Sequence, residues 1–363
     1  MVKIAFTGGG TGGHIYPGLA VAEELAGRFT PGTCKFFWIG SNTGVDRNLI
    51  KDSMEFFGIP AGRLRRYFSL KTIPDFFRVI AGFFAARRIL RDEKPALLFS
   101  KGGFVSVPPC LAAASLGIPV CTHESDISLG LATKINVRFA KRIFTSYNET
   151  VDFLPLALRP RAVRTGNPVR RSFRTADSQR GRDFLGLENE RILLVLGGSL
   201  GARELNGLIH ESLEDLCKWY TVVHQTGPDN EKDFVCTDKY KPYPYFGLEM
   251  PDVVAAAELV IGRSGAGMVW EGAVSGKPMV LVPLSGTGTR GDQVENARFF
   301  ENAGAAISLT GSAVNRENLV RIISDLAENT EKRSAMAASS VTIGKLDGTV
   351  LISDNIMELI KNE

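Results

Sequence analysis

The chain has 363 residues, 44% of them hydrophobic and 23% charged, with a formal net charge of +4, which is the composition of a soluble globular protein with two ordinary domains. The mild charge gives little support to nucleic-acid binding, and no apolar run approaches the ~18 residues that a membrane-spanning helix needs. We expect no signal peptide, because the first apolar run is short and leads directly into glycines. The five cysteines are widely spaced, so we expect free thiols in a reducing compartment and no zinc site.

Short apolar runs alternate along the chain with helix-length amphipathic segments. The strands expected in the first half are 2–7, 35–40, 96–100, 118–123 and 142–147, and those in the second half are 191–196, 221–225, 258–262 and 278–283. The helices expected between them include 17–27, 74–91, 105–116, 202–217, 266–275 and 291–303. Continuously apolar strands alternating with helices are typical of parallel sheets covered on both faces. We therefore expect doubly wound α/β domains.

A change of composition separates the two series of strands. Residues 150–190 are rich in Arg and Pro and poor in periodicity, which indicates the end of one domain and a linker into another. A glycine-rich turn follows the first strand of each half, TGGGTGG at 7–13 and LGGSLGA at 196–202. Ligands of open α/β sheets bind beyond the carboxyl ends of the strands. We therefore expect one glycine turn on each wall of a cleft.

The first glycine turn, Gly8 to Gly13, has the G-x-G-x-x-G spacing of dinucleotide-binding proteins. The acidic residue that should end the second strand is missing, since the nearest is Asp46, and a P-loop would have lysine where His14 stands. A ligand-free turn is one alternative. The glycines and the following helix, with Pro17 suited to its first turn, favour a bulky anion such as a diphosphate. His14 would then be an acid, a base or a hydrogen-bond donor beside the bound group, or a structural residue.

Ordered motifs along the whole chain resemble those of the MurG glycosyltransferases. They are GGTGGHIYPGLAVAEEL (9–25), SKGGFVSVP (100–108), HESD (123–126), GNPVR (166–170), LGGSLGARELN (196–206), GRSGAGMVWE (262–271) and RGDQVENA (290–297). The resemblance implies a UDP-GlcNAc-dependent hexosyltransferase of peptidoglycan synthesis. It would move GlcNAc with inversion to the 4-hydroxyl of the MurNAc-peptide of undecaprenyl-pyrophosphate lipid I, giving lipid II.

The same resemblance implies a GT-B fold, with two Rossmann-like doubly wound domains facing a central cleft. Residues 1–165 would form the acceptor- and membrane-facing domain, and residues 166–344 the UDP-GlcNAc-binding domain. A C-terminal helix within 345–363 would pack back on the first domain. The implied partners are UDP-GlcNAc, lipid I and an anionic membrane surface, with no nucleic acid and no cofactor. The implied location is peripheral, on the cytoplasmic face of the cell membrane.

The stretch GRSGAGMVWEGAVSGKPMVLVP (262–283) predicts a strand, a small-residue turn and a helix with Glu271 in its second turn. Turn amides can hold a phosphate, and a carboxylate accepts hydrogen bonds from the two hydroxyls of a ribose. By resemblance, Glu271 holds the ribose of the donor; the alternative is a solvated helix carboxylate. Arg263 either braces the loop or meets phosphate. The remaining donor contacts that the resemblance implies are Thr11, Gly12, Gly13, Asp126, Arg170, Ser199, Gly247 (uracil edge), Ala266, Gly267, Met268 and Gln293.

Two positions depart from the commoner family pattern. Many relatives have Gln where Leu200 stands, and Asn where Asp126 stands. If Asp126 contacts the sugar of the donor, an anion replaces a neutral amide near two phosphates.

The implied reaction is an in-line displacement in which a base takes the proton of the acceptor hydroxyl as UDP leaves. The base could be His14, Glu124 or Asp126. No D-x-D occurs in the chain, which agrees with a donor site that needs no metal. The alternatives are another GT-B enzyme, such as a diacylglycerol glycosyltransferase or a UDP-GlcNAc epimerase, a nicotinamide oxidoreductase, and a nucleotide-sugar-binding protein without activity. The motifs GGTGGH, SKGGF and HESD of the first half discriminate among the GT-B enzymes.

Residues 63–91 combine aromatic and basic side chains at helical spacing. The apolar ones are Phe76, Phe77, Ile80, Phe83 and Phe84, and the arginines near them are Arg78, Arg87, Arg88 and Arg91. Such a face suits docking on an anionic leaflet. The alternative is an ordinary helix that packs its phenylalanines on the sheet.

Overall fold

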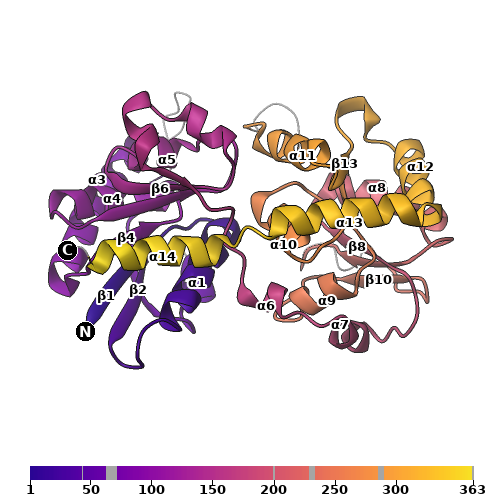
Figure 1. Cartoon of the computed structure of the whole chain (residues 1–363), viewed down its shortest axis with the longest axis horizontal. Helices are drawn as coiled ribbons and strands as arrows, with labels where there is room; N and C mark the ends of the chain where they lie inside the picture. The colour runs from indigo at the N-terminus through magenta and orange to yellow at the C-terminus, as the bar shows by residue number, and fades with distance from the viewer. Residues whose placement is uncertain (43, 63–71, 199–200, 229–233, 285–289, 362–363) are drawn as a thin grey trace. The chain divides into compact units, whose positions relative to one another are not determined.

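The computed structural model describes residues 1–42, 44–62, 72–198, 201–228, 234–284 and 290–361. Contacts divide the chain into two compact units (Figure 1), unit 1 comprising Met1–Arg170 with Asp347–Glu363, and unit 2 comprising Arg171–Leu346. The divisions fall a few residues after the boundaries expected at 165 and 344. Thr349 Oγ1 donates a hydrogen bond to the Val169 carbonyl (3.0 Å), which keeps this segment with the last helix in unit 1.

Unit 1 contains a parallel seven-stranded sheet in the order β3-β2-β1-β4-β5-β6-β7. Its strands are β1 (Val2–Thr7), β2 (Cys34–Ser41), β3 (Glu55–Ile59), β4 (Leu97–Ser100), β5 (Val120–Glu124), β6 (Ala140–Thr145) and β7 (Ala162–Arg164). Its α-helices are α1 (Gly12–Ala26), α2 (Gly44–Ile50), α3 (Thr72–Glu93), α4 (Val107–Ser115), α5 (Leu131–Asn136) and α14 (Gly348–Lys361), and its 3-10 helices are η1 (Phe104–Ser106), η2 (Glu149–Phe153) and η3 (Leu156–Arg161).

Helices cover both faces of this sheet. Successive side chains of a strand point to opposite faces. Ile4 and Phe6 of β1 belong to a buried cluster with residues of α1 and α14, whereas Ala5 belongs to a second cluster with residues of α3 and α4. The last helix of the chain is therefore part of the core of unit 1.

Unit 2 contains a parallel six-stranded sheet in the order β10-β9-β8-β11-β12-β13. Its strands are β8 (Ile192–Leu196), β9 (Thr221–Gln225), β10 (Tyr240–Tyr243), β11 (Leu259–Gly262), β12 (Met279–Leu281) and β13 (Ala306–Ser308). Its helices are α6 (Arg171–Arg174), α7 (Ser178–Leu185), α8 (Arg203–Leu216), α9 (Met250–Ala256), α10 (Ala266–Val274), α11 (Asp292–Asn302), α12 (Arg316–Glu328), α13 (Thr330–Gly344) and the 3-10 helix η5 (Gly311–Ala313).

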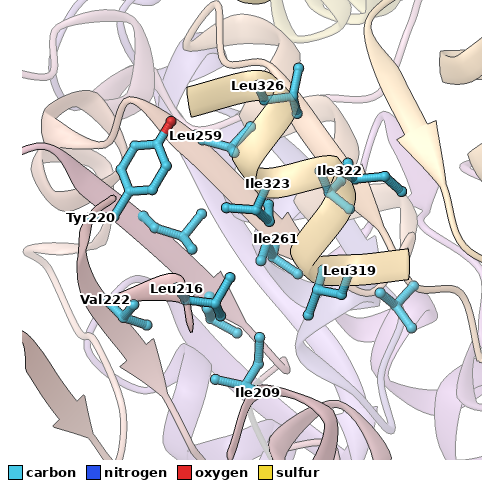
Figure 2. Close-up of a cluster of buried hydrophobic side chains, with 14 of the residues drawn as sticks. Ile209, Leu216, Tyr220, Val222, Leu259, Ile261, Leu319, Ile322, Ile323 and Leu326 are labelled. Carbon is cyan, nitrogen blue, oxygen red and sulfur yellow. The ribbon is translucent and has the colours of Figure 1, made fainter. Parts of the chain in front are cut away.

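One face of this sheet is closed by α8 and α12 (Figure 2). Ile209 and Leu216 of α8, together with Leu319 and Ile323 of α12, pack over Ile261 of β11. These side chains are buried almost completely, so this contact supplies much of the hydrophobic stabilisation of unit 2.

The two sheets share one topology, which places the turns that carry the sequence motifs. In each, the strand order reverses between the first strand and its neighbour, β1 and β4 in unit 1 and β8 and β11 in unit 2. Ligands of doubly wound sheets bind at this switch point, beyond the carboxyl ends of the strands. The two glycine turns follow β1 and β8, and the motifs SKGGF and GRSGAG follow β4 and β11.

All nine expected strands are present within two residues of their expected bounds, but four further strands were not predicted. These are β3, β7, β10 and β13, each at an edge of its sheet. Helices α12 and α13 were not predicted either.

The division between the two units falls within the stretch 150–190, between Arg170 and Arg171, but most of this stretch is regular structure and not a linker. This stretch contains η2, η3, the edge strand β7 and helices α6 and α7. Helix α7 is well capped, because the Asp177 carboxylate accepts from the Gln179 and Arg180 amides (2.7 and 3.0 Å) and Gly186 ends it in a left-handed conformation. Among the described residues, no helix is both long and apolar enough to span a bilayer.

Candidate active site

A buried carboxylate lies beneath the first glycine turn. Asp46 accepts hydrogen bonds from the Gly10 amide (2.9 Å) and from the Ser41 amide at the end of β2 (2.9 Å). A Cβ atom at Gly9 would collide with this carboxylate, so the turn tolerates only glycine there. Burial raises the pKa of Asp46, while the two amide hydrogen bonds oppose that shift. Asp46 therefore fixes the conformation of the glycine turn by linking it to the end of β2.

Helix α1 begins inside the glycine run, five residues before the expected start at 17. Thr11 is its N-cap residue, and the His14 amide donates to the Thr11 carbonyl (3.1 Å). His14 therefore lies in the first helical turn, and Pro17 lies in the second turn instead of the first. Gly12 and Gly13 precede His14 in this turn, and Thr11 is exposed at its entrance. Because Pro17 has no N–H, the Gly13 carbonyl lacks its regular helical donor.

The turn after β4 packs against the His14 ring. Gly103 has a φ of +76°, and a Cβ atom there would lie 2.7 Å from the Gly9 carbonyl oxygen and 3.0 Å from His14 Cδ2. The ring of Phe104 is equally close to Gly10, since a Cβ atom at Gly10 would lie 2.8 Å from Phe104 Cε1. The SKGGF motif thus fixes both the glycine turn and the histidine.

We expect Gly103→Ala to lower turnover about 10- to 100-fold, because it would displace His14, the expected catalytic group, and small displacements of such a group have effects of this size. UDP affinity should stay close to that of the wild type. The matched control is Gly117→Ala, where φ is similarly positive (+72°) but no atom lies within 4 Å of the added Cβ. Steady-state kinetics of both variants would test this, and equal losses in the two would show that backbone strain alone is responsible.

Glu124 organises the loop that follows β5. Its carboxylate accepts from the backbone amides of Ser125 (3.0 Å), Asp126 (3.2 Å) and Gly130 (2.9 Å). Both carboxylate oxygens are therefore engaged by the backbone of this loop, so the geometry disfavours Glu124 as the general base. Asp126 is half-buried, and its carbonyl accepts from Thr150 Oγ1 (3.2 Å).

Lys101 is a buried cation that the sequence analysis did not single out. It is 1% exposed, and its ammonium donates to Ser125 Oγ, which donates in turn to Asn167 Oδ1 (2.9 Å). Burial lowers the pKa of Lys101 to about 8, and the nearby Glu124 and Asp126 charges oppose this shift. Its position within the SKGGF motif, directly after β4, was the available signal.

Arg170 is the last residue of unit 1 and stacks on an aromatic ring of α1. Its guanidinium carbon lies 4.8 Å from the centroid of the Tyr16 ring. His123, in the HESD motif, contacts the Gly166 carbonyl through Nε2 (3.0 Å), and burial lowers its pKa well below the ordinary value. It is therefore neutral and holds the GNPVR segment in place.

In unit 2, helix α10 directs its N-terminus toward the switch point. It follows β11 after the turn Arg263–Gly265, and its first amides are those of Ala266, Gly267 and Met268. The first amides of a helix have no intrahelical acceptor, and the helix dipole is positive there, so the site favours a phosphate. Glu271 lies in the second turn of α10 and is half-buried.

Arg263 makes the contacts expected of a brace. Its guanidinium donates to the Val282 carbonyl (3.1 Å) and to the Glu204 carboxylate (2.9 Å). Gln293, in the first turn of α11, accepts from the Leu284 amide through Oε1 (2.8 Å). The amide nitrogen of Gln293 is the end of this side chain that suits a sugar hydroxyl.

Gly247 is exposed, and its amide donates to the Glu249 carboxylate (3.2 Å). The assigned Ser199 and the departure at Leu200 lie outside the described residues, as does most of the loop before α11. Groups of three or more His, Cys, Asp or Glu side chains that could hold a metal ion do not occur among the residues that the structure describes.

The two doubly wound units, each with a glycine turn at its switch point, have the architecture of the GT-B fold, and two family models show the class of protein to be a glycosyltransferase. Residues 4–145 match the glycosyltransferase family 28 N-terminal domain, and residues 192–352 match the family 28 C-terminal domain. The UDP-N-acetylglucosamine--N-acetylmuramyl-(pentapeptide) pyrophosphoryl-undecaprenol N-acetylglucosamine transferase of Treponema denticola is 47% identical, with 100% of both chains covered. The transferase of the same name from Treponema pallidum is 44% identical over 99% of this chain and 96% of its own.

Among solved structures, MurG of Acinetobacter baumannii is 25% identical, with a TM-score of 0.74 and coverage of 99% of this chain and 100% of its own. The chain belongs to glycosyltransferase family 28 and, within it, to the MurG family.

Proposed function

We propose that this protein transfers GlcNAc from UDP-GlcNAc to the 4-hydroxyl of the MurNAc-peptide of lipid I, giving lipid II in peptidoglycan synthesis. The observation that carries this function is the full-length identity of 47% to a transferase of that name. The glycine turns and helix N-termini at the switch points supply anion-binding groups of the kind that the chemistry requires.

Unit 2 binds the donor in this proposal. The amides that begin α10 and the turn after β8 hold the diphosphate, Glu271 accepts from the ribose hydroxyls, and Gln293 donates to a sugar hydroxyl. The backbone near Gly247 reads the uracil edge. The charge that develops on the leaving UDP is stabilised by helix N-termini, whose dipoles are oriented before the reaction begins.

Unit 1 supplies the acceptor side. His14 takes the proton of the acceptor hydroxyl as its oxygen attacks the anomeric carbon in line with the departing UDP. Asp126 is the second candidate for this base. Thr11, Gly12, Gly13 and Arg170 are the residues of unit 1 that the family resemblance implies as donor contacts.

The test is an incubation with radiolabelled UDP-GlcNAc and a short-chain lipid I analogue, in EDTA and in parallel with Mg²⁺. We expect a labelled disaccharide lipid at equal rates in both. No labelled lipid with a competent acceptor and an active reference enzyme would contradict the function. Conversion of UDP-GlcNAc without acceptor would instead favour an epimerase.

The outer face of α3 suits membrane docking. Phe76, Phe77, Ile80 and Phe84 are 54%, 64%, 39% and 64% exposed. Phe77, Ile80 and Phe84 follow the i, i+3, i+7 spacing of one helical stripe, and the side chain of Arg88, one turn further along it, is 80% exposed. We propose that this stripe enters the headgroup region of the anionic cytoplasmic leaflet, which places the protein peripherally on the membrane that holds lipid I.

Two details of the expected membrane face need correction. Phe83 is half-buried and packs against the core cluster that α3 and α4 share, because it lies on the sheet-facing side of α3. The arginines are also not all unpaired, since Arg78 contacts Asp75 (3.2 Å) and Arg88 contacts Asp92 (3.9 Å). The Arg88–Asp92 pair is exposed on both sides, so it is weak and can exchange for lipid headgroups. Residues 63–71 of the expected face lie outside the described residues.

Membrane binding should therefore be tested on the exposed stripe. We expect Phe77→Ser with Phe84→Ser to weaken binding to anionic liposomes at least about tenfold, since burial of each phenylalanine contributes about 1.5–3 kcal/mol. The control is Phe153→Ser with Leu156→Ser, which removes exposed apolar side chains elsewhere in unit 1 (50% and 78% exposed). Flotation would measure both, and equal flotation of the Phe77/Phe84 variant and the wild type would place the membrane contact elsewhere.

A further inference from the structure

A buried glutamine connects two segments of unit 2 at the carboxyl end of β9. Gln225 is 2% exposed. Its Nε2 donates to the Gly198 carbonyl (3.0 Å), and its Oε1 accepts from the Phe246 amide (3.0 Å). Because one neighbour is an acceptor and the other a donor, the amide group satisfies both in one orientation only. Neither methionine nor an ionised glutamate can make both bonds.

The first anchored group is at the base of the second glycine turn. The Gly198 carbonyl also accepts from the Gly201 amide (3.1 Å), and Gly198 has a φ of +90°. The side chain of Gln225 thus occupies the remaining acceptor position of this carbonyl. Gly198 belongs to the glycine segment after β8 that is proposed to hold the donor diphosphate.

The second anchored group directly precedes Gly247. The Phe246 ring is buried and packs on Tyr243, with ring centroids 4.8 Å apart. Backbone bonds from Thr226 to Tyr243 (2.9 Å) and from Gly227 to Pro244 (3.1 Å) already hold this segment to the end of β9. The side chain of Gln225 links this segment, through Phe246, to Gly198 as well. The segment at Gly198 and the segment at Phe246 are therefore held at a fixed separation.

We propose that Gln225 is a positioning residue that sets the distance between the turn for the diphosphate and the backbone that reads the uracil. The inference rests on the proposed donor site in unit 2. UDP spans both segments, so it binds tightly only if both stand at the right separation before it arrives. Uridine engages the base-reading segment and, through its ribose, Glu271, but it has no phosphate to reach the turn after β8, so its affinity does not depend on that separation.

The experiment compares Gln225→Met and Gln225→Glu with the wild type by calorimetry, using UDP and, in competition, uridine. The matched control is Gln179→Glu, the same substitution at an exposed position of unit 2. For Gln225→Met we expect the Kd for UDP to rise about tenfold, while the Kd for uridine stays within about twofold, because preorganisation benefits only the ligand that spans both segments.

The glutamate variant adds a dependence on pH. Near pH 8 its carboxylate repels the Gly198 carbonyl, and we expect the Kd for UDP to rise at least about tenfold. Near pH 5.5 the buried carboxyl, with its raised pKa, is protonated; its O–H replaces the donor, and affinity should recover toward the wild-type value at that pH. The neighbouring His224 does not contribute, because burial lowers its pKa to about 3. The Kd for UDP of the wild type and of the Gln179→Glu control, measured at both pH values, accounts for the effect of every other titrating group.

Thermal melting establishes that each variant is folded. The inference is overturned if Gln225→Met binds UDP as the wild type does, or if UDP and uridine lose affinity by the same factor, which indicates a purely structural role. If the methionine variant does not fold, the glutamate series decides, and an affinity that is independent of pH overturns the inference. Wild-type protein that binds uridine and UDP equally weakly would instead refute the donor site itself.

Discussion

We expect replacement of His14 by alanine to lower turnover at least ~100-fold and to leave the affinity for UDP near that of the wild type. General acid–base groups contribute about 10²–10⁴-fold to rate, and most of the groups proposed to bind UDP belong to unit 2. The histidine is held in the first turn of α1, with its ring packed against Gly103. That fixed position suits a catalytic group.

The measurement is steady-state turnover with lipid I analogue, together with calorimetry of UDP binding. His210→Ala is the matched control, because His210 is an exposed histidine of α8. Near-normal turnover of His14→Ala would make the histidine structural, and Asp126→Asn would then be the next variant to test as a base.

Glu271→Ala should weaken UDP binding about 10- to 100-fold, because loss of a hydrogen bond to a charged group costs about 1.5–3 kcal/mol. Glu271 lies on the second turn of α10, one turn beyond the amides proposed for the diphosphate. A ribose lies next to the diphosphate in UDP, so the spacing fits the proposed contact.

Calorimetry with UDP tests this assignment, and circular dichroism checks the fold. Glu317→Ala serves as the control, since it removes an exposed helix carboxylate of the same unit. If Glu271→Ala binds UDP as tightly as the wild type and the control, Glu271 is a solvated helix residue and the ribose is held elsewhere.

The central strands of both sheets could be predicted, but the edge strands could not. A strand such as Ile192–Leu196 is buried along its whole length and is therefore continuously apolar. An edge strand such as Ala162–Arg164 is partly exposed and carries no such pattern. This strand forms by pairing with β6, a separate segment of the chain, and the residues of the strand itself do not indicate that pairing.

Prediction of the candidate site from the sequence has the same limit. The glycine turns, His14 and Glu271 are visible as local patterns of consecutive residues. The roles of Asp46, Glu124 and Gln225 are not, because each carboxylate or amide is defined by backbone groups that other segments bring to it.

The sequence by itself determined the alternation of strands and helices, the position of the glycine turns and the family, since these depend on residue types at short spacing. Only the tertiary structure decided that Phe83 packs inward while Phe84, its neighbour in α3, is exposed. It also showed that Arg263 contacts Val282 and Glu204, and that one buried glutamine joins two loops of the proposed donor site. The physical reason is that burial and hydrogen-bond partners depend on residues that are distant in the chain and become neighbours only when the sheets form.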